Sequence, residues 1–68
     1  MTWEQFQEKI QEDMNCGKRH GRVILMEFRR HYKGNKEAIQ KLVSVKYDDE
    51  GRLVFKYIIN GKQKQMTI

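Results

Sequence analysis

Two turn signals in the last third of the chain constrain its fold more than any other feature of the sequence. Asn60-Gly61 is the strongest two-residue signal for a β-hairpin. Asp48-Asp49-Glu50-Gly51 is typical of a type I turn that is closed by a glycine bulge. Together these turns predict three consecutive antiparallel strands, of which the last two run from Leu53 to Ile59 and from Lys62 to Ile68.

The turns also predict which side chains share a face of the sheet. A two-residue loop at Asn60-Gly61 pairs Phe55 with Met66, and the preceding turn pairs Val45 with Phe55 and Val43 with Tyr57. Both registers agree on one apolar face. The expected core face carries Val43, Val45, Tyr47, Leu53, Phe55, Tyr57, Ile59, Met66 and Ile68. The expected solvent face carries Leu42, Ser44, Lys46, Val54, Lys56, Ile58, Gln63, Gln65 and Thr67.

The first residues of the chain have the pattern of an amphipathic helix. Thr2 and Gln5 form a capping box, in which each side chain accepts a hydrogen bond from the other residue's backbone N–H. Helical spacing then places four apolar residues on one stripe that should cover the sheet: Trp3, Phe6, Ile10 and Met14. We expect Gly17 to end this helix as a residue in the left-handed conformation.

The middle of the chain is predicted to be extended. The segment from Lys18 to Arg22 is strongly basic and contains Gly21, which favours a loop. The segment from Val23 to Tyr32 is rich in β-branched and aromatic residues, which favours a first strand. In that strand Ile24, Met26 and Phe28 should face the helix, with Val23 and Leu25 on the outer face.

Lys33-Gly34-Asn35-Lys36 is typical of a turn, and two interpretations remain for the residues that follow. Lys36 to Leu42 has good helical propensity with Asn35 as a cap, whereas alternation from Ile39 indicates a strand. We favour the strand, because a meander then needs no additional connection. The predicted fold is α+β, in which one amino-terminal helix packs on a four-stranded antiparallel meander of order 1-2-3-4 within a single domain, residues 1–68.

A chain of 68 residues leaves little material for a deep catalytic cleft, and no enzymatic motif is present, so we expect a binding protein without catalytic residues. Cys16, His20 and His31 are too few for a structural zinc site, and we expect no metal and no cofactor. The single cysteine, the lack of an apolar run of about 20 residues and the lack of a secretory signal favour the cytoplasm, with no membrane partner.

Charge is distributed unevenly along the chain, whose formal net charge is +5. Residues 1–14 hold four acidic side chains and one basic one, whereas residues 15–68 hold thirteen basic and five acidic side chains. A basic surface favours an anionic partner. We expect two basic clusters at opposite ends of the first strand, joined along the outer sheet face into a track for nucleic-acid phosphates, but no helix that presents basic residues to a groove. The residues of this track are Lys18, Arg19, Arg22, Arg29, Arg30, Lys33, Lys36, Lys46 and Lys56.

An alternative function uses the same outer face for binding protein. Leu25, Leu42, Val54 and Ile58 make that face more apolar than a solvated sheet face usually is, and an exposed apolar patch often marks a partner. The alternative is therefore a protein-protein interaction module, either a homodimer or an inhibitor or adaptor that docks on an acidic partner protein.

Overall fold

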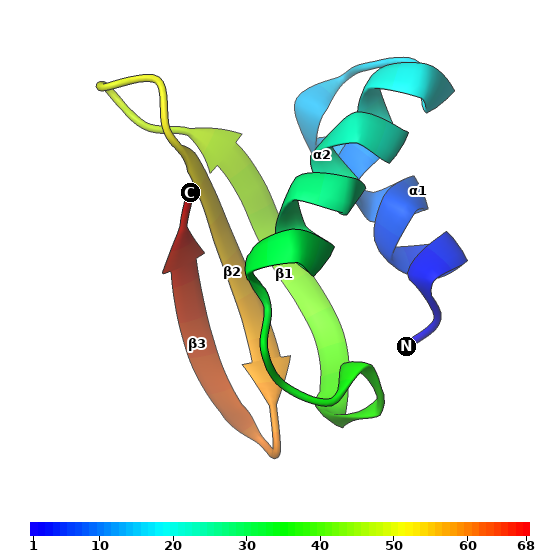
Figure 1. The fold of residues 1–68 in the computed structure, drawn as a ribbon, viewed down its shortest axis with the longest axis vertical. Coiled ribbons are helices and arrows are strands. Elements are labelled where there is room, and N and C mark those ends of the chain that lie inside the picture. The colour runs from blue at the N-terminus through cyan, green and yellow to red at the C-terminus, as the bar shows by residue number, and fades with distance from the viewer.

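The computed structural model describes all residues, 1–68, as a layer of two helices packed on one antiparallel sheet. The elements are α1 (Trp3–Met14), α2 (Lys18–His31), a short 3-10 helix η1 (Lys36–Ala38), β1 (Ile39–Tyr47), β2 (Leu53–Ile59) and β3 (Lys62–Thr67). Figure 1 shows both helices on the same side of the sheet, running in opposite directions, with the other side of the sheet uncovered. The predicted α+β class is confirmed.

Helix α1 begins and packs as its sequence predicts. The Thr2 hydroxyl accepts a hydrogen bond from the Gln5 N–H, and the Gln5 side chain accepts one from the Thr2 N–H. Phe6 and Ile10 are fully buried, and Trp3 and Met14 pack around them. The predicted helix end is wrong in detail, because Asn15 adopts the left-handed conformation (φ 49°) while Gly17 is extended and precedes α2.

The largest correction concerns Lys18 to Tyr32, predicted as a loop and a strand. Lys18–His31 forms α2, so the sheet has three strands instead of four. Four residues at helical spacing face inward: Gly21, Ile24, Leu25 and Phe28. Leu25, expected on an outer face, is therefore 5% exposed, whereas Met26, expected inside, is 60% exposed.

Gly21 lies inside α2, where it packs against α1. A Cβ atom at position 21 would lie 2.7 Å from Cγ of Gln11, well inside van der Waals contact. The absence of a side chain therefore allows α2 to approach α1 closely at this point. A glycine that indicates a loop in the isolated sequence is here a packing position between two helices.

The three strands follow the predicted meander. They lie in the order β1-β2-β3, all antiparallel, with the predicted pairs Val45–Phe55, Phe55–Met66 and Ile59–Lys62. Positive φ angles at Asn60 (51°) and Gly61 (74°) match the predicted hairpin turn. Strand β1 begins at Ile39, which confirms the favoured interpretation. Helical structure in this segment is limited to η1, which Asn35 caps.

A bulge in β1 changes which of its residues face the helices. The register shifts between Leu42 and Ser44, so that Leu42, and not Val43, lies opposite Tyr57. Leu42 is fully buried, which contradicts its expected place on the solvent face. Tyr47, expected in the core, is 50% exposed at the end of the strand.

The core lies between the helices and the inner sheet face, and its centre is aromatic. The Phe28 ring lies 4.6 Å from the ring of Phe6 and 4.9 Å from that of Phe55, measured between centroids. Tyr32 stacks on Phe28, and Tyr57 packs edge-on to both. The aromatic side chains on the buried side of α2 therefore hold this helix on β2. The opposite side of α2 consequently points away from the sheet.

Candidate functional site

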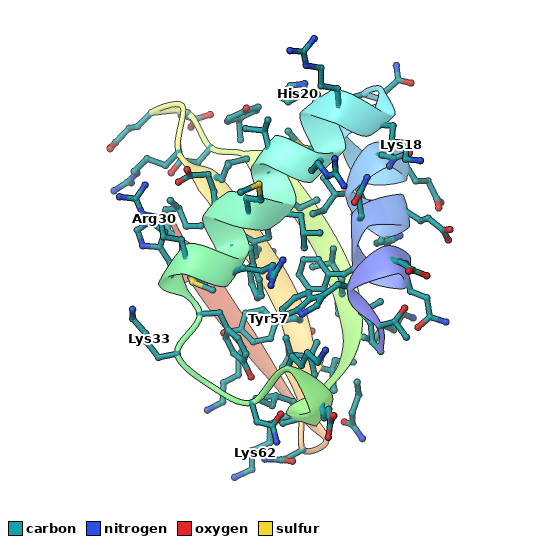
Figure 2. All side chains as sticks on the ribbon, turned by 45° about the vertical axis from the view of Figure 1, so that its right-hand side comes forward. Lys18, His20, Arg30, Lys33, Tyr57 and Lys62 are labelled. Carbon is teal, nitrogen blue, oxygen red and sulfur yellow. The ribbon has the colours of Figure 1, made fainter.

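The exposed side of α2 carries the densest group of cations in the molecule, and we call it the α2 face. Its outermost stripe has an arginine at each end and two apolar residues between them, Val23 (56% exposed) and Met26 (60% exposed). Figure 2 shows α2 crossing in front of the sheet, with Lys18 and His20 at one end and Arg30 at the other. The α2 face consists of Lys18, Arg19, Arg22, Val23, Met26, Arg29 and Arg30.

Most of the cations on this face have no carboxylate partner. Lys18, Arg19 and Arg22 form no ion pair, and the Arg30 guanidinium lies 4.0 Å from the Glu27 carboxylate, at the limit of an ion pair. The Arg29 guanidinium lies over the Trp3 ring, 5.3 Å from its centroid. The positive charge of the α2 face is therefore available to an external anion.

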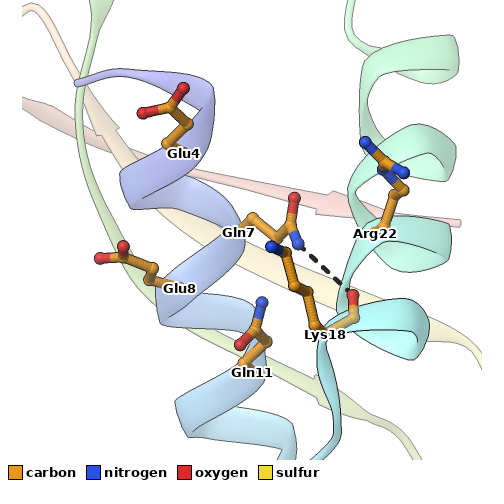
Figure 3. A pocket seen from close by; sticks show the side chains of 6 residues that line it. All are labelled: Glu4, Gln7, Glu8, Gln11, Lys18 and Arg22. Atoms are coloured by element: carbon orange, nitrogen blue, oxygen red, sulfur yellow. Dashed lines mark hydrogen bonds between the residues drawn. The ribbon is translucent and has the colours of Figure 1, made fainter.

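A polar hollow of about 530 Å³ lies between α1 and α2 and is lined by residues of both helices. Its lining is entirely polar: Glu4, Gln7, Glu8, Gln11, Lys18 and Arg22. The Gln7 side-chain amide donates a hydrogen bond to the Lys18 carbonyl oxygen (3.4 Å). Figure 3 shows the carboxylates of Glu4 and Glu8 pointing away from Lys18 and Arg22. Helix α1 thus forms an acidic border beside the basic helix.

The uncovered side of the sheet carries a second, smaller group of cations. Strand pairing puts Lys46 beside Val54, Lys56 beside Ser44 and Lys41 beside Ile58, all on the side away from the helices. No carboxylate is among the strand residues on that side. We call this the sheet face and define it by Lys41, Ser44, Lys46, Val54, Lys56 and Ile58.

Lys41 was not among the predicted site residues. Regular alternation along β1 would turn its side chain inward, but the register shift between Ile39 and Lys41 turns it outward. No local sequence signal marks this irregularity, because neither residue is a glycine. The bulge therefore adds a third lysine to the sheet face.

The predicted continuous basic track is wrong. Both helices cover the same side of the sheet (Figure 1). The cations of α2 therefore lie on that side, whereas strand pairing puts Lys46 and Lys56 on the other. The expectation that no helix presents basic residues is also wrong, because α2 does so. Lys33 and Lys36 are exposed in the connection from α2 to β1, with Lys33 beyond Arg30 in Figure 2.

The predicted protein-binding patch is only half present. Leu25 and Leu42 are buried in the core and cannot contact a partner. Val54 and Ile58 do lie on the sheet face and are partly exposed. The more exposed apolar pair, Val23 and Met26, lies instead on α2, where helical periodicity would have found it.

Two further observations concern other kinds of chemistry. No group of three or more His, Cys, Asp or Glu side chains lies close enough together to hold a metal ion. Neither helix is both long and apolar enough to span a bilayer. The groups with perturbed pKa values lie outside both cationic faces; burial, for example, raises the pKa of the Tyr57 phenol above its ordinary value.

Comparison with protein-family models, with curated proteins and with solved structures finds no match for this chain.

Proposed function

We propose that the protein is a non-enzymatic binding protein that binds nucleic acid, with the α2 face as its main contact. One observation carries the proposal: five cationic side chains lie on a single exposed helix face, and only Arg30 has a carboxylate within 4.0 Å. Phosphate groups are the natural partners of such a surface, because arginine donates paired hydrogen bonds to two phosphate oxygens at once.

The binding would be largely independent of base sequence. Val23 and Met26, at the centre of the α2 face, have no hydrogen-bonding side-chain groups with which to distinguish base edges. The surrounding arginines and Lys18 contact phosphates, which carry no sequence information. Affinity would then fall steeply as salt is raised, with a slope of about −0.9 for each phosphate neutralised on duplex DNA.

Duplex is favoured over single strand by the position of the aromatic side chains. Proteins that hold single strands stack bases on exposed aromatic rings. Here Trp3 packs against Phe6 and Phe28, and Tyr32 stacks on Phe28. Tyr47 is the only aromatic side chain that is half exposed, and it lies at the end of β1 and not on the α2 face.

The acidic border on α1 would set the side from which a duplex approaches. Glu4 and Glu8 are exposed beside the α2 face and repel phosphates. The outermost cations, Arg19 and Arg30, are the ones farthest round the helix from that border. A cytoplasmic location belongs to the same proposal, because a reducing compartment keeps the lone thiol of Cys16 free.

The test is a titration of a fluorescently labelled 20-base-pair DNA duplex, followed by anisotropy at about 50 and 150 mM salt. The double variant Arg19→Gln/Arg22→Gln should weaken binding at low salt and reduce the salt slope by about 2, the contribution of two phosphate contacts. Arg52→Gln is the matched control, because its guanidinium already contacts Asp48 and Glu50. No binding of duplex by the wild-type protein at 50 mM salt would end the proposal.

A second candidate function is favoured by the exposure of Val23 and Met26. An apolar centre surrounded by arginines is also the usual composition of a protein interface, in which methionine and arginine are enriched. The partner would then be an acidic protein surface or, in a homodimer, a second copy of this chain. Under this alternative Val23→Ser/Met26→Ser abolishes partner binding, whereas nucleic-acid affinity, which depends on charge, changes little.

A further inference from the structure

We infer that one molecule bridges two nucleic-acid duplexes, holding one on the α2 face and the other on the sheet face. This inference rests on the proposed function and goes beyond it, because a single binding face cannot link two duplexes. Its basis is that the fold places the α2 face and the sheet face, each with several exposed cations, on opposite sides of the sheet.

The two faces are separated by the full thickness of the protein. The α2 face points away from the core on the helix side, and Lys41, Lys46 and Lys56 point away from the core on the other side of the sheet. The smallest dimension of the molecule is 19 Å. That exceeds the Debye length of about 8 Å at physiological salt, so two bound duplexes would repel each other only weakly.

The sheet face has the charge complementarity that a second duplex requires. Three lysines lie on it without a carboxylate among the neighbouring strand residues, and Lys41 and Lys46 are exposed. Long lysine side chains on the open side of a sheet suit contact with a phosphate backbone, which needs charge without a shaped groove. Val54 and Ile58 lie on either side of Lys56 along β2, beside Lys46 and Lys41, and are partly exposed.

One duplex cannot satisfy both faces by wrapping over the helix side of the molecule. Helix α1 lies beside α2 and against β1, and Glu4, Glu8 and Glu12 are exposed along it. A phosphate backbone that left the α2 face in that direction would meet these carboxylates before reaching the lysines of the sheet. A single duplex is therefore not expected to reach both faces by way of α1.

The experiment uses two DNA duplexes, one immobilised on beads and one fluorescent, with the protein added at about 50 mM salt. Wild-type protein should capture the fluorescent duplex on the beads, and capture should fall again at large protein excess, when every duplex is separately saturated. Lys46→Gln/Lys56→Gln removes two charges from the sheet face. Lys62→Gln/Lys64→Gln is its matched control, since these exposed lysines lie on the opposite side of the sheet.

We expect the Lys46→Gln/Lys56→Gln variant to lose at least five-fold in capture while it still binds a single duplex, and the control variant to keep most of its capture. Arg19→Gln/Arg22→Gln should lose both capture and single-duplex affinity. Circular dichroism checks that each variant is folded. Light scattering checks that the protein is a monomer, because a dimer would bridge through two α2 faces.

Three results would overturn the inference. Wild-type protein that binds a single duplex without capturing a second shows that bridging is absent while the proposed function holds. Capture that is unchanged in Lys46→Gln/Lys56→Gln shows that the sheet face is not used. Absence of any duplex binding removes the proposed function and the bridging with it.

Discussion

The carboxylate of Asp13 accepts a hydrogen bond from the backbone N–H of Val45, 32 residues away, at 3.2 Å. The same carboxylate lies 3.0 Å from the Lys9 ammonium and holds the pKa of that ammonium above its ordinary value. At the other end of β1, the amino terminus donates a hydrogen bond to the Ile39 carbonyl oxygen. Helix α1 and Met1 thus occupy backbone groups on the outer edge of β1, which an edge strand otherwise leaves free to pair with another chain.

Replacing Asp13 with alanine should destabilise the protein by about 1 to 2 kcal/mol, because the partly buried N–H of Val45 loses its acceptor. Chemical denaturation measures the change as a lower midpoint. Glu12→Ala is the control, since this exposed carboxylate makes no hydrogen bond or ion pair. Equal midpoints for the two variants would contradict the role given to Asp13.

The bulge in β1 predicts that truncating Leu42 destabilises the protein more than truncating its neighbour Val43. Leu42→Ala should cost about 2 to 5 kcal/mol, because Leu42 is fully buried opposite Tyr57. Val43→Ala should cost about 1 kcal/mol or less, because Val43 lies outside the core. Thermal unfolding of both variants compares their stabilities. A larger loss for Val43→Ala than for Leu42→Ala would show that Val43, and not Leu42, faces the core, as it would in a strand without the bulge.

Gly61 is expected to be needed for its backbone conformation alone. Its φ is 74°, and no atom lies within 4 Å of the place where a Cβ would stand. Gly61→Ala should therefore cost about 1 kcal/mol through left-handed strain, and Gly61→Asn should cost less, since asparagine tolerates that conformation. The melting temperature of Gly61→Ala should be about 4 to 8 °C below that of the wild type. A smaller loss for Gly61→Ala than for Gly61→Asn would contradict the role given to the left-handed conformation.

Acidification should weaken the turn between β1 and β2. A hydrogen bond from the Arg52 N–H, with further ones from the Glu50 N–H and the Arg52 side chain, holds the pKa of the Asp48 carboxyl below its ordinary value of 3.8. A carboxyl with a lowered folded-state pKa stabilises the fold above its unfolded-state pKa and loses that contribution as pH falls through the folded-state value.

Asp48→Asn should consequently be less stable than the wild type near pH 7, and the difference should shrink as pH falls below about 4. Melting temperatures from pH 7 to pH 2 measure it. Asp49→Asn is the control, because the neighbouring carboxylate accepts no hydrogen bond. A difference between Asp48→Asn and wild type that stays constant with pH would rule out the carboxylate as its cause.

The elements predicted correctly from sequence are those whose determinants are local. A capping pair and a four-residue stripe define α1, and the Asn60-Gly61 turn defines the register of β2 with β3. These signals need no knowledge of the rest of the fold. The same turn between Asp48 and Gly51 also fixes the first part of the pairing between β1 and β2, as far as the bulge.

The second helix was missed because its determinant is a tertiary contact. Val23, Ile24 and Leu25 favour a strand by composition, and Gly21 indicates a loop unless Gln11 of the first helix is known to lie against it. The basic residues were identified, but their grouping into two faces depends on whether Lys18–His31 is helix or strand. The incorrect prediction of a strand in place of α2 therefore leaves the fold class unchanged but alters the predicted arrangement of the binding residues.

The order β1-β2-β3 means that every strand pairs with its neighbour in sequence, and three residues join the two helices. Most of the structure thus consists of two local units, a helical hairpin and a three-stranded meander, and docking of α1 on β1 is the main step that joins residues far apart in the chain. Topologies of this kind fold quickly, on a scale of about milliseconds or less for small domains. We therefore expect rapid folding without a long-lived intermediate. The apolar sides of the helical hairpin and of the sheet would then be exposed to solvent only briefly.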